Sequence, residues 1–154
     1  MKKIFFAILI AAVVNGNAVA NIKAIDNPLV AQSFEREFAG AHSVKWEVLD
    51  GKEIYHAFFV YNNEPLNAYF NEEGTLLGTG RYLKFENLPM LTAKSIKEKY
   101  SQFTVLETIE FGSASGTSYI VKLESEKLKL YIQAYSNGSI SVLKKEKKNL
   151  DIKL

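Results

Sequence analysis

Two stretches of this sequence match each other, and that internal repeat constrains the fold more strongly than any other feature. Residues 30–38 align with residues 92–100 at an offset of 62. Further along, an offset of 64 pairs residues of the same kind: Tyr55 with Tyr119, Phe59 with Leu123, Leu66 with Leu130, and Gly74 with Gly138. The offset changes within a predicted hairpin loop, where an insertion is tolerated. One supersecondary unit is therefore expected to occur twice in the chain.

Each copy is predicted to begin with an amphipathic helix. In the first copy, Asn27 and Pro28 are typical of a helix start, and Val30, Phe34 and Phe38 recur at every fourth position. In the second copy, the corresponding apolar face is formed by Leu88, Thr92, Ile96 and Tyr100. We therefore expect helices over 28–40 and 88–100.

Short strands are predicted after each helix, because apolar alternation is interrupted by turn residues such as Asn62–Asn63 and Asn137–Gly138. In the first copy we expect strands over 43–48, 54–61, 66–70, 75–77 and 81–85, with Gly78 and Gly80 loosening the chain before the last of them. In the second copy we expect strands over 104–111, 118–123, 127–134 and 139–143. The predicted fold class is α+β: a tandem repeat of one helix and an antiparallel four-stranded β-meander, with the helices packed on one face of the sheet.

The first twenty residues have the three parts of a secretory signal peptide. Basic Lys2 and Lys3 precede an apolar run over 4–14, and the stretch 18–20 (Ala-Val-Ala) supplies small residues for cleavage. The apolar run of eleven residues is much shorter than the ~20 residues that span a bilayer. We therefore predict removal of residues 1–20, a periplasmic or secreted bacterial protein, and no membrane span after cleavage. The remaining chain is predicted to form one domain over 21–145, made of the repeats 27–86 and 87–145, and a lysine-rich tail over 146–154.

The charge balance argues against a nucleic-acid partner. The full chain has 19 basic and 17 acidic residues, and loss of Lys2 and Lys3 leaves 17 of each. A neutral chain lacks the electrostatic footprint that nucleic-acid binding requires. A local basic excess remains near the end of the chain. We interpret it as a solvated terminal segment rather than a docking site; it consists of Lys144, Lys145, Lys147 and Lys148.

Several motifs follow one another in a fixed order over residues 27–145. They are Val44-Lys-Trp46-Glu, Tyr55-x-Ala-x-Phe59, Leu66-x-Ala-Tyr-Phe70-Asn-Glu-Glu-Gly74, and Leu88-Pro89 before a helix that ends in Lys99-Tyr100. This series resembles the PepSY-like, β-lactamase-inhibitor-like family of exported bacterial proteins. The family's usual turn, Phe-Asp-x-Asp-Gly, is altered here in both copies. The resemblance implies a fold, an extracytoplasmic location and the binding of another protein.

Reactive side chains are scarce in the predicted mature chain. It contains no cysteine, the histidines His42 and His56, and the aspartates Asp26, Asp50 and Asp151. Their spacing does not bring a nucleophile, a base and an orienting carboxylate together, and it does not match a metal-ligand pattern. We therefore predict no catalytic residue, no metal site and no cofactor, and a protein that is not an enzyme.

The side of the sheet that carries no helix is the candidate binding site. Alternate strand residues point to opposite faces, and the set predicted to face the helices is Tyr55, Ala57, Phe59, Leu66, Ala68, Phe70, Tyr119, Val121, Leu123, Leu128, Leu130 and Ile132. The opposite set is rich in aromatic residues, which commonly mark a binding surface when exposed. The predicted partner contacts are His56, Phe58, Tyr69, Tyr131 and Tyr135. The alternative is that these aromatic residues pair across strands only to hold the sheet together.

Two functions remain open on the sequence. The first is an exported, non-enzymatic module that binds or inhibits an envelope or secreted protein through the helix-free face. The second is an envelope carrier or sensor that holds a small apolar ligand between the sheet and the helices. The sequence offers no polar group obviously reserved for such a ligand.

Overall fold

The structure is a computed structural model that describes residues 25–49 and 54–148. The predicted signal peptide, Asp50 and the last six residues of the predicted tail lie outside these residues. In the described part, α2 (Pro28–Glu37) precedes β1 (His42–Leu49), β2 (Ile54–Tyr61), β3 (Glu64–Phe70) and β4 (Leu76–Tyr82). The 3₁₀ turn η1 (Phe85–Asn87) leads to α3 (Met90–Lys99), β5 (Thr104–Ser113), β6 (Gly116–Glu124), β7 (Leu128–Ala134) and β8 (Ile140–Lys147).

The strands form one eight-stranded sheet in chain order, from β1 to β8. The pairs β1–β2, β2–β3, β3–β4, β6–β7 and β7–β8 are antiparallel. The α+β class and the meander are therefore as predicted. The chain divides into a first unit, which ends at Arg81 and takes in Phe111–Gly116, and a second unit, which holds Tyr82–Glu110 and the chain from Thr117 onward.

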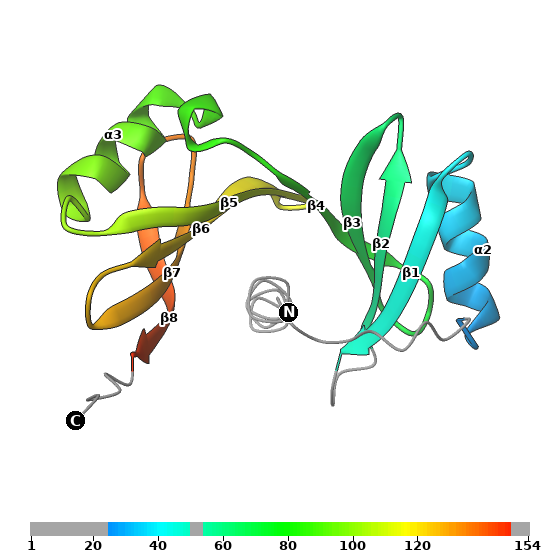
Figure 1. The fold of residues 1–154 in the computed structure, drawn as a ribbon. Coiled ribbons are helices and arrows are strands. Elements are labelled where there is room, and N and C mark those ends of the chain that lie inside the picture. The colour runs from blue at the N-terminus through cyan, green and yellow to red at the C-terminus, as the bar shows by residue number, and fades with distance from the viewer. Residues whose placement is uncertain (1–24, 50–53, 149–154) are drawn as a thin grey trace. The chain divides into compact units, whose positions relative to one another are not determined.

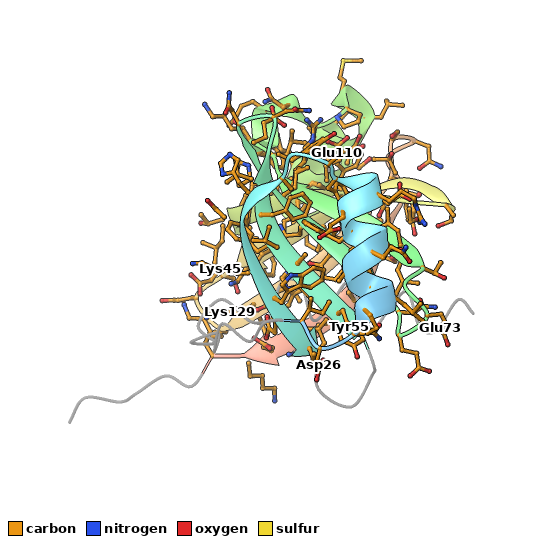
Figure 2. All side chains as sticks on the ribbon, turned by 90° about the vertical axis from the view of Figure 1, so that its right-hand side faces the viewer. Asp26, Lys45, Tyr55, Glu73, Glu110 and Lys129 are labelled. Carbon is orange, nitrogen blue, oxygen red and sulfur yellow. The ribbon has the colours of Figure 1, made fainter. Side chains whose placement is uncertain are left out.

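The core of the first unit lies between α2 and its strands (Figure 1). The helix side chains Val30, Phe34 and Phe38 pack on a buried set formed by Ala57, Phe59, Ala68 and Phe70. The rings of Phe34 and Phe59 meet edge to face, with centroids 4.9 Å apart. Such aromatic pairs add about 1 kcal/mol to the stabilisation that burial itself provides. The helix-facing residues of this unit are those predicted, and Tyr55 points to the helix side (Figure 2).

The second unit has an equivalent core under α3 (Figure 1). Leu88 and Ile96 pack on a buried set formed by Tyr119, Val121, Leu123, Leu130, Ile132 and Ala134. Leu128, a predicted helix-facing residue, is only half-buried and lies outside this cluster. Leu128 still lies on the same side of β7 as Leu130, because no register shift separates them, so alternation along β6 and β7 predicts the helix-facing side and Leu128 lies at its half-buried end.

A glycine turn packs against the helix of each unit. A Cβ added to Gly74 would lie 2.6 Å from the carbonyl oxygen of Leu29, and one added to Gly138 would lie 2.7 Å from Ser95 Oγ. Both glycines have left-handed backbone, with φ of +77° and +82°. In the first unit, Asn27 Oδ1 caps α2 by accepting from two backbone amides, while its Nδ2 donates to the carbonyl of Glu72 at 2.9 Å. These contacts fix where each helix begins relative to its own hairpin.

Two parts of the strand prediction are wrong. Gly78 and Gly80 do not loosen the chain: β4 continues through them, so the strands predicted over 75–77 and 81–85 are one strand that ends at Tyr82, and Phe85 belongs to η1. The reason is a close approach: a Cβ on Gly78 would lie 2.5 Å from Phe111 Cζ, so glycine is the residue that this strand position accommodates. Strand β8 runs to Lys147 instead of ending at Leu143, because Lys144 to Lys147 continue to pair with β7. This part of the lysine-rich segment is therefore a strand and not a solvated tail.

Candidate functional site

In the first unit, the helix-free face is organised around His56. Its cross-strand neighbours are Glu47 on β1 and Tyr69 on β3. The imidazole stacks on the Tyr69 ring, with centroids 4.7 Å apart and planes within 6°. Its Nδ1 lies 3.5 Å from Glu47 Oε2 and its Nε2 lies 2.8 Å from Asn67 Oδ1. The ring is thus held by one stacking contact and two polar contacts, and it is not free to reorient.

Tyr69 does not present its ring to solvent. It is only 2 % exposed, because His56 stacks on it and the Phe111 ring lies 6.0 Å from it. Phe111 reaches this position because Gly78, opposite Tyr69 in the register of β3 and β4, has no side chain. The expectation of an exposed aromatic at Tyr69 is therefore wrong, and cross-strand packing accounts for its burial. Phe58 is half-buried on the same face, opposite Lys45, which points away from α2 (Figure 2).

In the second unit, a β-bulge decides which side chains reach the helix-free face. Val142 is opposite Ile132, but Lys144 is opposite Tyr131, so Leu143 is an extra residue in β8. Without the bulge, alternation would leave Lys144 on the same side as Val142. The bulge moves it to the other side, next to Tyr131, as bulges commonly do when they re-aim a side chain. A register irregularity of this kind has no reliable mark in the sequence.

Tyr131 lies at the centre of this face, between two lysines. Lys122 Nζ is 5.7 Å and Lys144 Nζ is 5.9 Å from the ring centroid, within the range of cation–π attraction. The hydroxyl lies 3.5 Å from Glu146 Oε2, at the long limit of a hydrogen bond. Burial raises the pKa of Tyr131 above its usual value, and the carboxylates of Glu146 and Glu107 raise it further. The ring is only 3 % exposed, so the expectation that Tyr131 is an exposed contact is also wrong.

Ion pairs connect the remaining charges of this face. Lys144 pairs with Glu146, and the hydrogen bond from this lysine is the main cause that lowers the pKa of the Glu146 carboxyl. Glu124 is shared by Lys148 at 3.2 Å and Lys129 at 3.9 Å. We call this set the lysine–tyrosine face; it comprises Lys122, Glu124, Lys129, Tyr131, Lys144, Glu146 and Lys148.

Tyr135 lies just beyond β7, in the turn that leads to β8. Its amide donates to the carbonyl of Ser139 at 3.0 Å, and its own carbonyl accepts from Thr92 Oγ1 at 2.7 Å. With 38 % of its surface exposed, it is the most exposed of the five predicted contacts. Its backbone is fixed against α3, so its side chain extends from a rigid position.

A cavity of about 540 Å³ lies beside α3 in the second unit. Its apolar lining comes from η1 and the outer flank of the helix, with Phe85, Leu88, Met90 and Ala93, and its rim carries Glu86, Lys94, Lys97 and Glu98. This cavity does not lie between helix and sheet, where the sequence predicts a ligand as the alternative function. Over residues 25–49 and 54–148, no group of three or more His, Asp or Glu side chains could hold a metal ion.

No protein-family model and no curated protein sequence matches this chain. Solved structures do match its fold. A DUF2874 family protein from Bacteroides ovatus has a TM-score of 0.69 at 18 % identity, over 81 % of this chain and 89 % of that one. A BLIP-like protein from Bacteroides fragilis has a TM-score of 0.65 at 18 % identity, over 81 % and 88 %. A protein from Bacteroides eggerthii whose name assigns it to the periplasm has a TM-score of 0.67 at 15 % identity, over 81 % and 89 %.

At these identities the likeness establishes the fold. It supports a BLIP-like fold, while the PepSY-like part of the resemblance noted in the sequence stays a prediction. The name of the Bacteroides eggerthii protein agrees with the extracytoplasmic location that the first twenty residues predict. Within the described ranges, no helix is both long enough and apolar enough to cross a bilayer.

Proposed function

We propose that this chain is an exported, non-enzymatic binding module of the bacterial periplasm, and that it binds a protein partner through the helix-free side of its sheet. The observation that carries this proposal is the lysine–tyrosine face, where a bulge aims charged side chains at a central aromatic ring. Such an arrangement exceeds what a sheet needs for stability, since exposed ion pairs contribute little to it. The BLIP-like name of one structural neighbour is compatible with this role.

We further propose that residues 27–86 and 87–145 are tandem copies of one unit. The support is the matching position of the helix–turn contacts: Gly74 lies against Leu29, and Gly138 lies against Leu91. These glycines and leucines occupy equivalent places in the sequence repeat, at offsets of 64 and 62. If the two are copies, the strands of each have one side packed on the helix and one helix-free side.

The five predicted contacts take two different roles in this proposal. Tyr69 and Tyr131 are positioning residues, because they are buried and hold His56 and the two flanking lysines in place. His56, Phe58 and Tyr135 are the predicted contacts that retain some exposure. A partner would therefore touch the charged groups and the ring edges that surround the buried tyrosines.

Photo-cross-linking in the native host tests the proposal. A benzophenone amino acid replaces Lys129, whose side chain is 38 % exposed on the lysine–tyrosine face, and in a matched control it replaces Leu91, which is 53 % exposed on α3 of the same unit. We expect a discrete protein adduct from position 129 and none from position 91. Equal adducts from both positions, or none from position 129 in a folded protein, would contradict the proposal.

A second candidate function is supported by the cavity beside α3, which is large enough for a small apolar ligand. Native mass spectrometry of protein purified from its own host tests it. A bound small molecule that is lost after Ala93→Arg, but kept after Ala39→Arg on an exposed site of the first unit, would support this candidate. A mass equal to that of the polypeptide alone would contradict it.

A further inference from the structure

The two units carry opposite charge. Among the described residues, the first unit has seven acidic and three basic side chains, a net charge of −4. The second unit has seven acidic and eleven basic side chains, a net charge of +4. The neutral total of the predicted mature chain conceals this polarity. An anionic partner would therefore be attracted to the second unit and repelled by the first.

Within the second unit, the lysine–tyrosine face places cations on the helix-free side of β6, β7 and β8. It has four lysines and two glutamates, and the carboxylate of Glu107 lies close enough to raise the pKa of Tyr131. The charges alternate in sign across the face and do not form a uniform basic patch. Such a mosaic suits a protein surface of complementary pattern, whereas the glutamates would repel a uniformly anionic membrane.

Lys122 is the cation that this face leaves available. Lys144, Lys129 and Lys148 each lie within ion-pair distance of a carboxylate. Across the part of the chain that the structure describes, Lys122 has no ion pair, and its ammonium group rests over the Tyr131 ring. The residue is half-buried and its ammonium group lies over the ring, so the position of the charge is largely set before binding.

We propose that the lysine–tyrosine face docks an acidic segment of a protein partner, with a carboxylate of that segment pairing with Lys122 beside the Tyr131 ring. This inference rests on the proposed binding function. It adds that the partner segment is acidic and that Lys122 is the residue that pairs with it. Lys144 and Glu146, fixed to each other, border the docked carboxylate and favour a partner with charges of both signs around it.

The lysines of β8 also have a simpler role, which is to keep a sheet edge from pairing with another chain. Lys145 and Lys147 are opposite Leu130 and Leu128, so they point to the side away from Tyr131. They share the edge with Lys144 and have the same charge, but they are not part of the lysine–tyrosine face. Lys145 therefore provides a matched control for Lys122.

The experiment measures peptide binding by fluorescence anisotropy with the full mature chain. The probe is a labelled peptide of alternating Glu and Thr, and the control probe carries Gln in place of Glu. We expect the Glu peptide to bind more tightly than the Gln peptide. We also expect Lys122→Gln to weaken binding about threefold to fivefold, which corresponds to the loss of one partly exposed ion pair. Lys122→Arg should retain binding, and Lys145→Gln should change it less than twofold.

Equal weakening by Lys122→Gln and Lys145→Gln would overturn the inference, because binding would then follow overall charge. Tighter, Lys122-dependent binding to phosphatidylglycerol vesicles than to the Glu peptide would overturn it in favour of a membrane surface. A melting curve unchanged by Lys122→Gln ensures that lost binding is not lost folding. If the position-129 adduct forms in cells and Lys122→Gln leaves both its yield and peptide binding unchanged, the inference fails while the proposed function stands.

Discussion

Replacing Gly78 with alanine should destabilise the protein, because the space over this strand position is already filled. The new Cβ would lie 2.5 Å from Phe111 Cζ, 3.0 Å from Phe111 Cε1 and 2.7 Å from the carbonyl oxygen of Gly112. Carbon atoms in contact are normally about 3.5–4.0 Å apart. The Phe111 ring can rotate or shift, but the Gly112 carbonyl belongs to the backbone of β5 and can move only with that strand.

The expected cost follows from these distances. Overpacking by one methyl group costs about 1–3 kcal/mol, and a backbone contact places this site in the upper half of that range. Alanine restricts the unfolded chain and offsets about 0.4–1 kcal/mol of the cost. We therefore expect Gly78→Ala to lower the free energy of unfolding by about 2 kcal/mol. Gly112→Ala is the matched control, since its Cβ would meet nothing closer than Thr79 Oγ1 at 3.6 Å.

Urea unfolding followed by circular dichroism measures both variants. Gly112→Ala should be as stable as the wild type or slightly more stable. Combining Gly78→Ala with Phe111→Leu should cost less than the sum of the two single changes, because the shorter side chain removes one of the two clashes. Equal stability of Gly78→Ala and Gly112→Ala would refute the reasoning that Phe111 packs over Gly78 and buries Tyr69.

Three further predictions concern other contacts. Gly138→Ala should lower the free energy of unfolding by about 2–3 kcal/mol, because both the positive φ and the nearby Ser95 Oγ oppose a Cβ. Gly116→Ala, at φ +111° with nothing within 4 Å, should lower it less. The same loss in both variants would refute the claim that the turn at Gly138 packs closely on α3. Asn27→Ala should cost about 1 kcal/mol through loss of the α2 cap, measured by thermal unfolding, and no change would contradict the capping role. The pKa of Glu146 is lower in the folded chain than its ordinary value of 4.5, so its contribution to stability is present above pH 4.5 and is lost as the pH falls through the folded pKa. Unfolding free energy should therefore fall less between pH 7 and pH 3 in Glu146→Gln than in the wild type, and parallel pH profiles would contradict this.

The fold is predictable where it depends on local pattern. The four-residue spacing of Val30, Phe34 and Phe38 predicts the buried side of α2, and Asn27 with Pro28 predicts its start. Alternation along β2, β3, β6 and β7 predicts the residues on the helix side, because the side-chain period of a strand is two wherever no bulge intervenes. These features depend on neighbours along the chain, which a sequence displays directly.

The candidate site is less predictable because it depends on long-range geometry. Phe111 packs against Tyr69, which lies 42 residues earlier in the chain. The only sign of this contact in the sequence is Gly78, and glycine is also common in turns and loops. The bulge at Leu143 reverses the side on which Lys144 lies, and simple alternation cannot anticipate a change of register. A glycine inside an otherwise regular strand is the signal that could have suggested a close approach.

Lysine labelling in living cells tests the central claim, that the helix-free side is occupied by a partner, and it does not require that partner to be identified. An acylating reagent is applied to intact host cells and to the purified chain, and the extent of modification is compared residue by residue by mass spectrometry. If the claim holds, Lys122 is protected in cells relative to the purified protein, while Lys94, exposed on α3, reacts equally in both. Equal reactivity of Lys122 in cells and in the purified chain would contradict it.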